Sequence, residues 1–146
     1  MRTGTGVVLA HVDDRYLHSE LTDRIIKQFY DVYNELGFGF LESVYEEALS
    51  RALVSAGFRT SRQSCLPVTF RGEIIAEFKA DIVVDDKVIL ELKAARSVEP
   101  AHEAQLLNYL RATNVEVGLL LNFGPHPQVR RLVFSNQRKG ISVDQR

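Results

Sequence analysis

The spacing of apolar residues divides the first part of the chain into two helices. From Ser19 to Leu36, apolar side chains recur every three or four residues, which places them on one face of a helix. Gly37 is expected to end this helix, because glycine readily adopts the left-handed conformation of a C-terminal cap. The same spacing runs from Leu41 to Leu53, and Gly57 is expected to end the second helix.

Beyond the second helix the spacing changes to that of strands. Alternation begins at Leu66, and turn residues at Arg71–Glu73 close that segment. A helix over about Ala101–Asn114 follows the central strands and leads to a continuous apolar run, typical of a strand buried on both faces. The expected strands cover residues 66–70, 74–84, 88–93, 117–123 and 129–134.

These elements predict a single α/β domain over residues 19–135. Two N-terminal helices precede a central mixed β-sheet, in which an antiparallel meander is joined through a crossover helix to a further strand. Residues 1–18 lack clear periodicity and are interpreted as an N-terminal extension, and residues 136–146 as a C-terminal tail.

The composition is that of an ordinary globular protein. The 146 residues are 45% hydrophobic and 25% charged, which argues against disorder, and no apolar run approaches the length of a membrane span. The net charge of −1 neither indicates nor excludes binding to nucleic acid, because arginines can gather on one face. The lone Cys65, interpreted as a packing residue, cannot form an internal disulfide, which favours a reducing, cytoplasmic location.

In the strand expected over residues 74–84, side chains at even and odd positions lie on opposite faces, since successive side chains of a strand alternate. One face is expected to be uniformly apolar: Ile74, Ala76, Phe78, Ala80, Ile82 and Val84. The other face carries Glu77, Lys79 and Asp81. The next strand splits in the same way, with Glu91 and Lys93 on its polar side.

The loop between these two strands decides whether their polar rows meet. A three-residue loop at Asp85–Lys87 pairs Val84 with Val88 and sets Asp81 opposite Glu91, where side chains lie roughly 4.5–5.5 Å apart at Cβ. A two-residue loop would shift the register by one and mix polar with apolar faces, which register selection opposes. The three-residue loop is therefore expected.

Two opposed carboxylates are destabilising unless a cation compensates them. Magnesium prefers a few carboxylates, waters and phosphate oxygens as ligands. Lys93 lies two residues beyond Glu91 on the same face, where its ammonium could orient an attacking water or offset charge building on phosphorus. The alternative is an exposed, ion-paired sheet face, which is the commoner origin of such a pattern when Asp81, Glu91 and Lys93 are taken alone.

The next helix carries a second group of polar residues. His102, Gln105 and Tyr109 are three and four residues apart, so they share one helix side beside an apolar stripe. In that position they suit contacts with the phosphates or bases of a substrate. The alternative is an amphipathic helix whose boundary residues are simply half-buried, which for this helix alone is the commoner explanation.

At this point the sequence resembles a known family. The segment Gly39–Tyr45 matches the signature of the bacterial GxxExxY proteins, which are placed in the PD-(D/E)XK nuclease superfamily. The segments His102–Leu110 (HEAQLLNYL) and Leu120–Gly124 (LLNFG) look like further parts of that family's pattern. The resemblance covers roughly residues 21–134 in the expected order.

The resemblance implies a role for each matching residue. Glu42 corresponds to the acidic residue that the first helix presents to a metal, and Asp81 to the metal-binding aspartate, although Ala80 stands where the superfamily's nominal proline would be. Glu91 and Lys93 correspond to the second acid and the lysine. The backbone carbonyl of Leu92 is a further expected metal ligand. Gln105 and Tyr109 match the Gln-x-x-x-Tyr motif of the helicase-associated exonuclease branch, with His102 beside them as a substrate contact.

Together these observations predict a nuclease that uses Mg²⁺, with Mn²⁺ as a substitute, and acts on nucleic acid, most simply DNA. Fold membership does not establish function. Two alternatives therefore stay open: a catalytically silent module that binds nucleic acid or a partner, and a subunit that is active only in a homodimer or a larger assembly.

Overall fold

The computed structural model of the 146-residue chain describes residues 16–140. Most of the predicted N-terminal extension and of the predicted C-terminal tail lies outside the described residues. None of the helices in the described part is long and apolar enough to cross a membrane.

The helices and strands follow the predicted order. They are α1 (Ser19–Leu36), α2 (Glu42–Ser55), β1 (Thr60–Phe70), β2 (Glu73–Val84), β3 (Val88–Lys93), α3 (Pro100–Ala112), β4 (Val117–Phe123), β5 (Pro127–Val133) and α4 (Asn136–Lys139). The main difference is that β1 begins at Thr60, whereas the apolar alternation starts only at Leu66. The extra residues are mostly polar and exposed, so no apolar pattern marked them.

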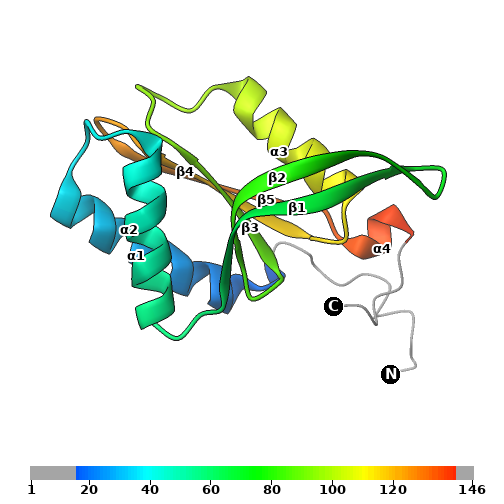
Figure 1. The fold of residues 1–146 in the computed structure, drawn as a ribbon, viewed down its shortest axis with the longest axis horizontal. Coiled ribbons are helices and arrows are strands. Elements are labelled where there is room, and N and C mark those ends of the chain that lie inside the picture. Colours follow the sequence, from blue (N-terminus) through cyan, green and yellow to red (C-terminus); the bar gives the residue numbers. More distant parts are fainter. Residues whose placement is uncertain (1–15, 141–146) are drawn as a thin grey trace.

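The five strands form one sheet in the order β1-β2-β3-β4-β5. Neighbouring strands are antiparallel except β3 and β4, which run parallel and are connected through α3 (Figure 1). This topology confirms the predicted mixed sheet, with an antiparallel meander and a crossover helix.

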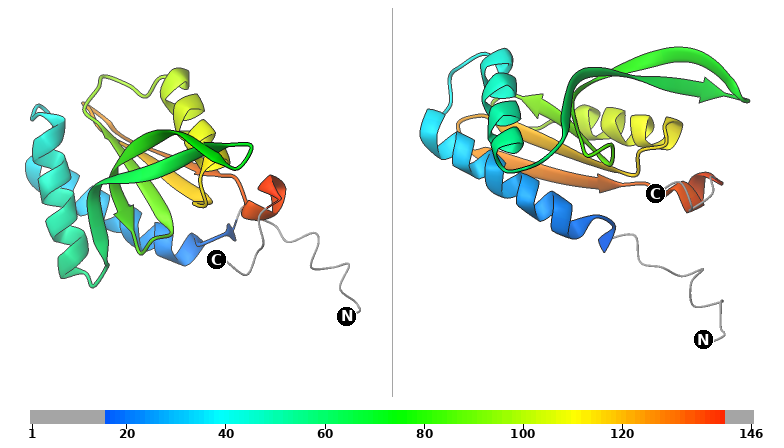
Figure 2. Two further views of the ribbon diagram at one scale, coloured as in Figure 1. Left: turned by 45° about the vertical axis from the view of Figure 1, so that its right-hand side comes forward. Right: turned by 60° about the horizontal axis from the view of Figure 1, so that its bottom comes forward.

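Helices cover both faces of the sheet. Helices α1 and α2 pack on one face and α3 on the other (Figure 2). Strand β4 is buried throughout, and its Leu119 and Leu121 face the first pair of helices while Leu120 faces α3. Gly118 allows α3 to approach closely, because a Cβ there would lie 3.1 Å from the Leu106 side chain.

The prediction that β2 has one continuous apolar face is wrong. Ile74 is 67% exposed near the tip of the β1–β2 hairpin. Phe78 and Ala80 pack toward α3, whereas Ile82 and Val84 of the same parity pack toward α1 and α2.

The change of face coincides with an interruption in the pairing of β1 with β2. Arg62 pairs with Ile82 and Ser64 with Ala80, but between them Gln63 has a φ of 51°, in the left-handed region. Beyond this point the hairpin twists away from the sheet and extends over α3 (Figures 1 and 2). The pairs on both sides of Gln63 keep the same register, so no residue is inserted here, and the side chains of β2 change face across the unpaired Asp81.

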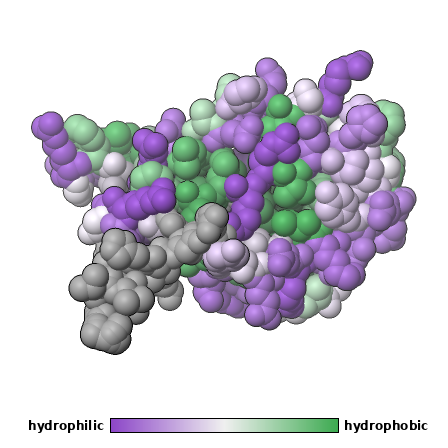
Figure 3. All heavy atoms as spheres, turned by 180° about the vertical axis from the view of Figure 1, so that it is seen from behind, coloured by the Kyte–Doolittle hydropathy of each residue, from purple (hydrophilic) through white to green (hydrophobic). Residues whose placement is uncertain are grey.

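The prediction that Cys65 is a packing residue is also wrong, because its side chain is exposed on the edge strand β1. Further along this hairpin, the large apolar side chains of Phe70, Ile74 and Ile75 are exposed as well. Seen from behind, the projecting part of the molecule shows apolar and hydrophilic surface side by side (Figure 3).

Candidate functional site

The site lies where β2 and β3 separate. Their ladder pairs Val84 with Val88 and Ile82 with Leu90, which is the register expected from a three-residue loop. Beyond the pair Ile82–Leu90, the hydrogen bonds between the two strands join a backbone N–H of one strand to a side-chain carboxylate of the other. The Leu92 N–H donates to Asp81 Oδ2 at 2.9 Å.

A second bond runs in the opposite direction. The Asp81 N–H donates to Glu91 Oε1 at 3.2 Å, so each carboxylate accepts a hydrogen bond from the backbone of the other strand. These two bonds hold the carboxylates of Asp81 and Glu91 beside each other just beyond Ile82 and Leu90, the last regular pair of the ladder.

The surroundings of both carboxyl groups disfavour their charged forms. Burial raises the pKa of Asp81, and the charges of Glu46 and Glu42 raise it further, against hydrogen bonds from the Leu92 N–H and Gln63. Burial and then the charge of Asp81 raise the pKa of Glu91 to about 8, although the Asp81 N–H and the Lys93 charge act against this shift. Two half-buried acids therefore lie together, and the nearby charge of Lys93 offsets their raised pKa only in part.

Lys93 is close enough for its charge to lower the pKa of Glu91, as expected from their shared strand face. Within residues 16–140, no lysine or arginine forms an ion pair with Asp81 or Glu91. The half-buried Lys93 ends β3 and pairs in register with Asn122 of β4.

Asn122 anchors the chain that follows Lys93. Its buried side chain accepts a hydrogen bond from the Ala95 N–H at 2.9 Å and donates to the Ala95 carbonyl at 3.0 Å. It also donates to Gln128 Oε1 at 3.0 Å. Sequence reasoning missed this role, although one amide within the apolar run Val117–Phe123 was a signal that it is satisfied internally.

Glu42 is the first residue of α2, and its side chain is exposed. Its charge raises the pKa of both Asp81 and Glu91, so it lies on their side of the molecule. The three carboxylates do not, however, close into a ligand set. Among residues 16–140, no three Asp, Glu, His or Cys side chains stand close enough together to hold a metal ion.

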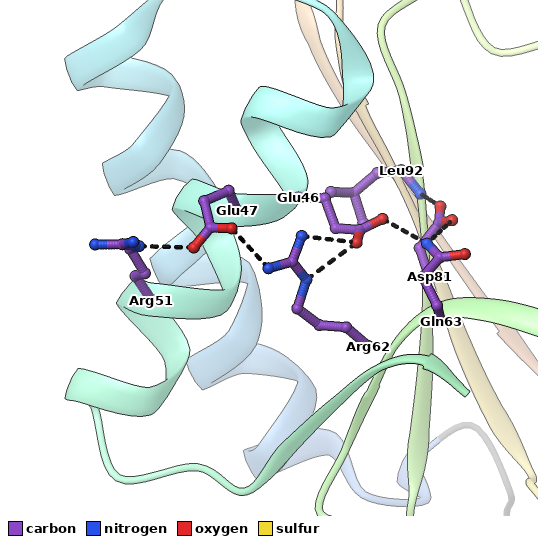
Figure 4. A network of polar contacts seen from close by, with 7 residues as sticks. All are labelled: Glu46, Glu47, Arg51, Arg62, Gln63, Asp81 and Leu92. Carbon is purple, nitrogen blue, oxygen red and sulfur yellow. Dashed lines mark hydrogen bonds and ion pairs between the residues drawn. The ribbon is translucent and has the colours of Figure 1, made fainter.

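Helix α2 brings a carboxylate that the sequence reasoning had not selected. Glu46 lies four residues after Glu42, on the same helix face. Its Oε1 accepts a hydrogen bond from Gln63 Nε2 at 2.8 Å, and the same nitrogen lies 3.5 Å from Asp81 Oδ1 (Figure 4). The helical spacing from Glu42 was the available signal for Glu46. The sequence held no signal for Gln63.

The structure places the three predicted residues of α3 in different settings. His102 Nδ1 accepts from the Glu99 N–H at 3.3 Å and so completes a capping box at the start of α3. Gln105 is exposed. The ring of Tyr109 stacks on Phe78, with centroids 3.6 Å apart. Within residues 16–140, no hydrogen bond, ion pair or ring contact joins these three side chains to Asp81 or Glu91. Their roles in binding substrate remain predictions.

The place where β2 and β3 separate, here called the fork, carries the carboxylates of Asp81 and Glu91. Its oxygen atoms suit a divalent cation as ligands. Asp81 and Glu91 offer hard carboxylate oxygens, held side by side without a compensating ion pair in the described part of the chain. That the Leu92 carbonyl is a metal ligand remains a prediction. The hydrogen bond that joins Leu92 to Asp81 is formed by its N–H. Burial and then the charge of Asp81 raise the pKa of Glu91, and a cation would offset both effects.

The chain is similar to known proteins over most of its length. Residues 19–132 match the family model of the PD-(D/E)XK nuclease superfamily. A solved structure of the protein SSO0001 is 22% identical, with a TM-score of 0.49, and the match covers 83% of this chain. The chain spans only 61% of the length of SSO0001. The chain matches no curated protein.

Proposed function

The chain belongs to the PD-(D/E)XK nuclease superfamily, and we propose that it is a nuclease that hydrolyses phosphodiester bonds of DNA and requires Mg²⁺ or Mn²⁺. The observation that carries the proposal is the pair of carboxylates at the fork, in which Asp81 and Glu91 are each held by the backbone of the opposite strand. This arrangement keeps two acids together where their charges repel, as a cation site requires.

In the proposed reaction, water attacks phosphorus and releases a proton to solvent, the bond to one ester oxygen breaks, and that oxygen takes up a proton from solvent. Asp81 and Glu91 would hold the cation directly, with Glu42 nearby. When bound, the cation supplies Lewis-acid activation of the water and the phosphate.

The other proposed roles belong to the protein's own side chains. Lys93 orients the attacking water or offsets the negative charge on phosphorus, because it lies beside Glu91 without an ion-pair partner in residues 16–140. His102, Gln105 and Tyr109 on α3 position the substrate.

Cleavage assays with a matched pair of lysine variants test the proposal. Lys93→Ala should abolish cleavage with Mg²⁺ or Mn²⁺, because the lysine acts mainly on the transition state. Lys79→Ala, which removes an exposed lysine from the neighbouring strand β2, should leave cleavage unchanged. The substrates are single-stranded, duplex and flapped DNA and RNA, with EDTA as the blank. Equal activity of wild type and Lys93→Ala would identify a contaminant and refute the proposal.

One observation favours a second candidate function. Glu42 is exposed, and residues 16–140 contain no ready group of three metal-binding side chains. A silent nucleic-acid-binding module, or a subunit that becomes active in a larger assembly, would fit that arrangement. Calorimetric titration of Mg²⁺ into wild type and Asp81→Ala separates the candidates, since metal binding that depends on Asp81 favours the nuclease.

A further inference from the structure

Gln63 adopts a backbone conformation that strands normally avoid. Its φ of 51° lies in the left-handed region, which is unfavourable for residues that carry a Cβ. The residue sits inside β1, between two regular pairs with β2, and faces Asp81 across the interrupted ladder. Strained residues of this kind persist where the surrounding structure holds them, often at functional sites.

The side chain of Gln63 bridges two acidic residues. Its Nε2 donates to Glu46 Oε1 at 2.8 Å and lies 3.5 Å from Asp81 Oδ1. The other oxygen of Asp81, Oδ2, accepts from the Leu92 N–H. The Asp81 carboxylate is therefore held at both oxygens, from β3 on one side and from β1 on the other (Figure 4).

The chemistry of an amide suits this position. A glutamine NH₂ group can donate to two carboxylates at once, and it carries no charge. An arginine or lysine in its place would hold the carboxylates equally well but would cancel the negative charge that attracts a cation. The neutral bridge therefore orders both acids and leaves the charge of Asp81 available, whereas Glu46 is also ion-paired with Arg62.

Glu46 is more deeply buried than its neighbour Glu47. The Glu46 side chain is only 12% exposed, and its Oε2 accepts from Arg62 Nε at 3.0 Å while Oε1 accepts from Gln63. Glu47 is 48% exposed and bonds to Arg62 and Arg51. Figure 4 shows Glu46 directed toward Asp81 and Glu47 on the far side of Arg62.

We infer that Gln63 is a positioning residue of the proposed metal site, which orients the Asp81 carboxylate and brings Glu46 of α2 toward it as a further carboxylate. The inference rests on the proposed function. It assigns a purpose to the strained backbone of β1 and to the burial of Glu46, which the roles of Asp81, Glu91 and Lys93 leave unexplained.

The test measures Mg²⁺ affinity by calorimetry, independently of cleavage. Gln63→Gly removes the amide, but glycine accepts a positive φ freely, so this variant should fold and melt no lower than wild type. Its Mg²⁺ affinity should fall about tenfold, the lower end of the loss found when supporting partners of metal ligands are removed. Glu46→Gln should lose a similar factor. Glu47→Gln is the matched control and should bind Mg²⁺ as wild type does.

The possible outcomes separate this inference from the function on which it rests. If Asp81→Asn loses Mg²⁺ binding while Gln63→Gly and Glu46→Gln keep wild-type affinity, the positioning role is refuted and the metal site stands. Equal losses in Glu46→Gln and Glu47→Gln would also refute it, because the effect would then be general. If wild type binds no Mg²⁺, both the proposed metal-dependent nuclease and the positioning role of Gln63 are refuted. If Gln63→Gly does not fold, the comparison of Glu46→Gln with Glu47→Gln decides the question.

Discussion

The raised pKa of Glu91 makes the stability of the metal-free protein depend on pH. In the folded chain this pKa is about 8, against an ordinary value of 4.5. Folding therefore favours the protonated carboxyl group. The resulting stabilisation is complete below the ordinary pKa and is lost as the pH rises through about 8. Metal-free protein should be more stable in mild acid than in mild base.

The size of the effect follows from the two pKa values. Full ionisation of Glu91 in the folded state costs roughly 5 kcal/mol relative to the unfolded chain. Between about pH 5.5 and about pH 8, the free energy of unfolding should fall by about 3 kcal/mol from this group alone. Glu91→Gln removes the titration and keeps an oxygen that can accept the Asp81 N–H, so this part of the slope should vanish.

Urea unfolding in EDTA, followed by circular dichroism at several pH values, measures the slope. Glu77→Gln, which removes an exposed carboxylate from β2, is the control and should keep the wild-type slope. Mg²⁺ should restore the stability of wild type at high pH, because binding to the folded state alone stabilises it. Parallel pH profiles for wild type and Glu91→Gln would refute the reasoning.

Two further predictions concern the structure that supports the site. Asn122→Ala should lower the free energy of unfolding by about 2–4 kcal/mol, because it leaves the N–H and the carbonyl of Ala95 unpaired. Asn108→Ala on the exposed side of α3 is the control. A loss below about 1 kcal/mol in Asn122→Ala would contradict the role of Asn122. Gly124→Ala should lower the melting temperature more than Gly118→Ala, because its Cβ would lie 2.1 Å from the Ala95 carbonyl oxygen, whereas at Gly118 the obstacle is the flexible Leu106 side chain at 3.1 Å. Equal shifts in calorimetric scans would contradict this ranking.

The sequence alone determined the features that depend on local spacing. The three-residue loop at Asp85–Lys87 and the requirement to keep faces unmixed predicted the register of β2 with β3, and the structure has that register. Strand parity then predicted that Asp81 and Glu91 meet with Lys93 beside them. The register prediction held because a hairpin register is set within a few residues of its turn, and the shared site of the three residues stays a prediction.

The position of β2 relative to the two helical layers was decided by tertiary structure. Parity assumes that a strand continues without interruption, whereas the pairing of β2 with β1 is interrupted at Asp81, opposite Gln63. Phe78 and Ile82 therefore face different helices although they share parity. The hydrophobic pattern of β2 does not mark this interruption.

The supporting contacts of the site were also decided by tertiary structure. Gln63, Glu46 and Asn122 act through hydrogen bonds to residues that are 18, 17 and 27 positions away. Bonds of that kind form only after helices and strands have packed, and the residues that make them have no periodicity of their own. Spacing along the chain thus determined which acids oppose each other on β2 and β3, whereas packing determined what holds them there.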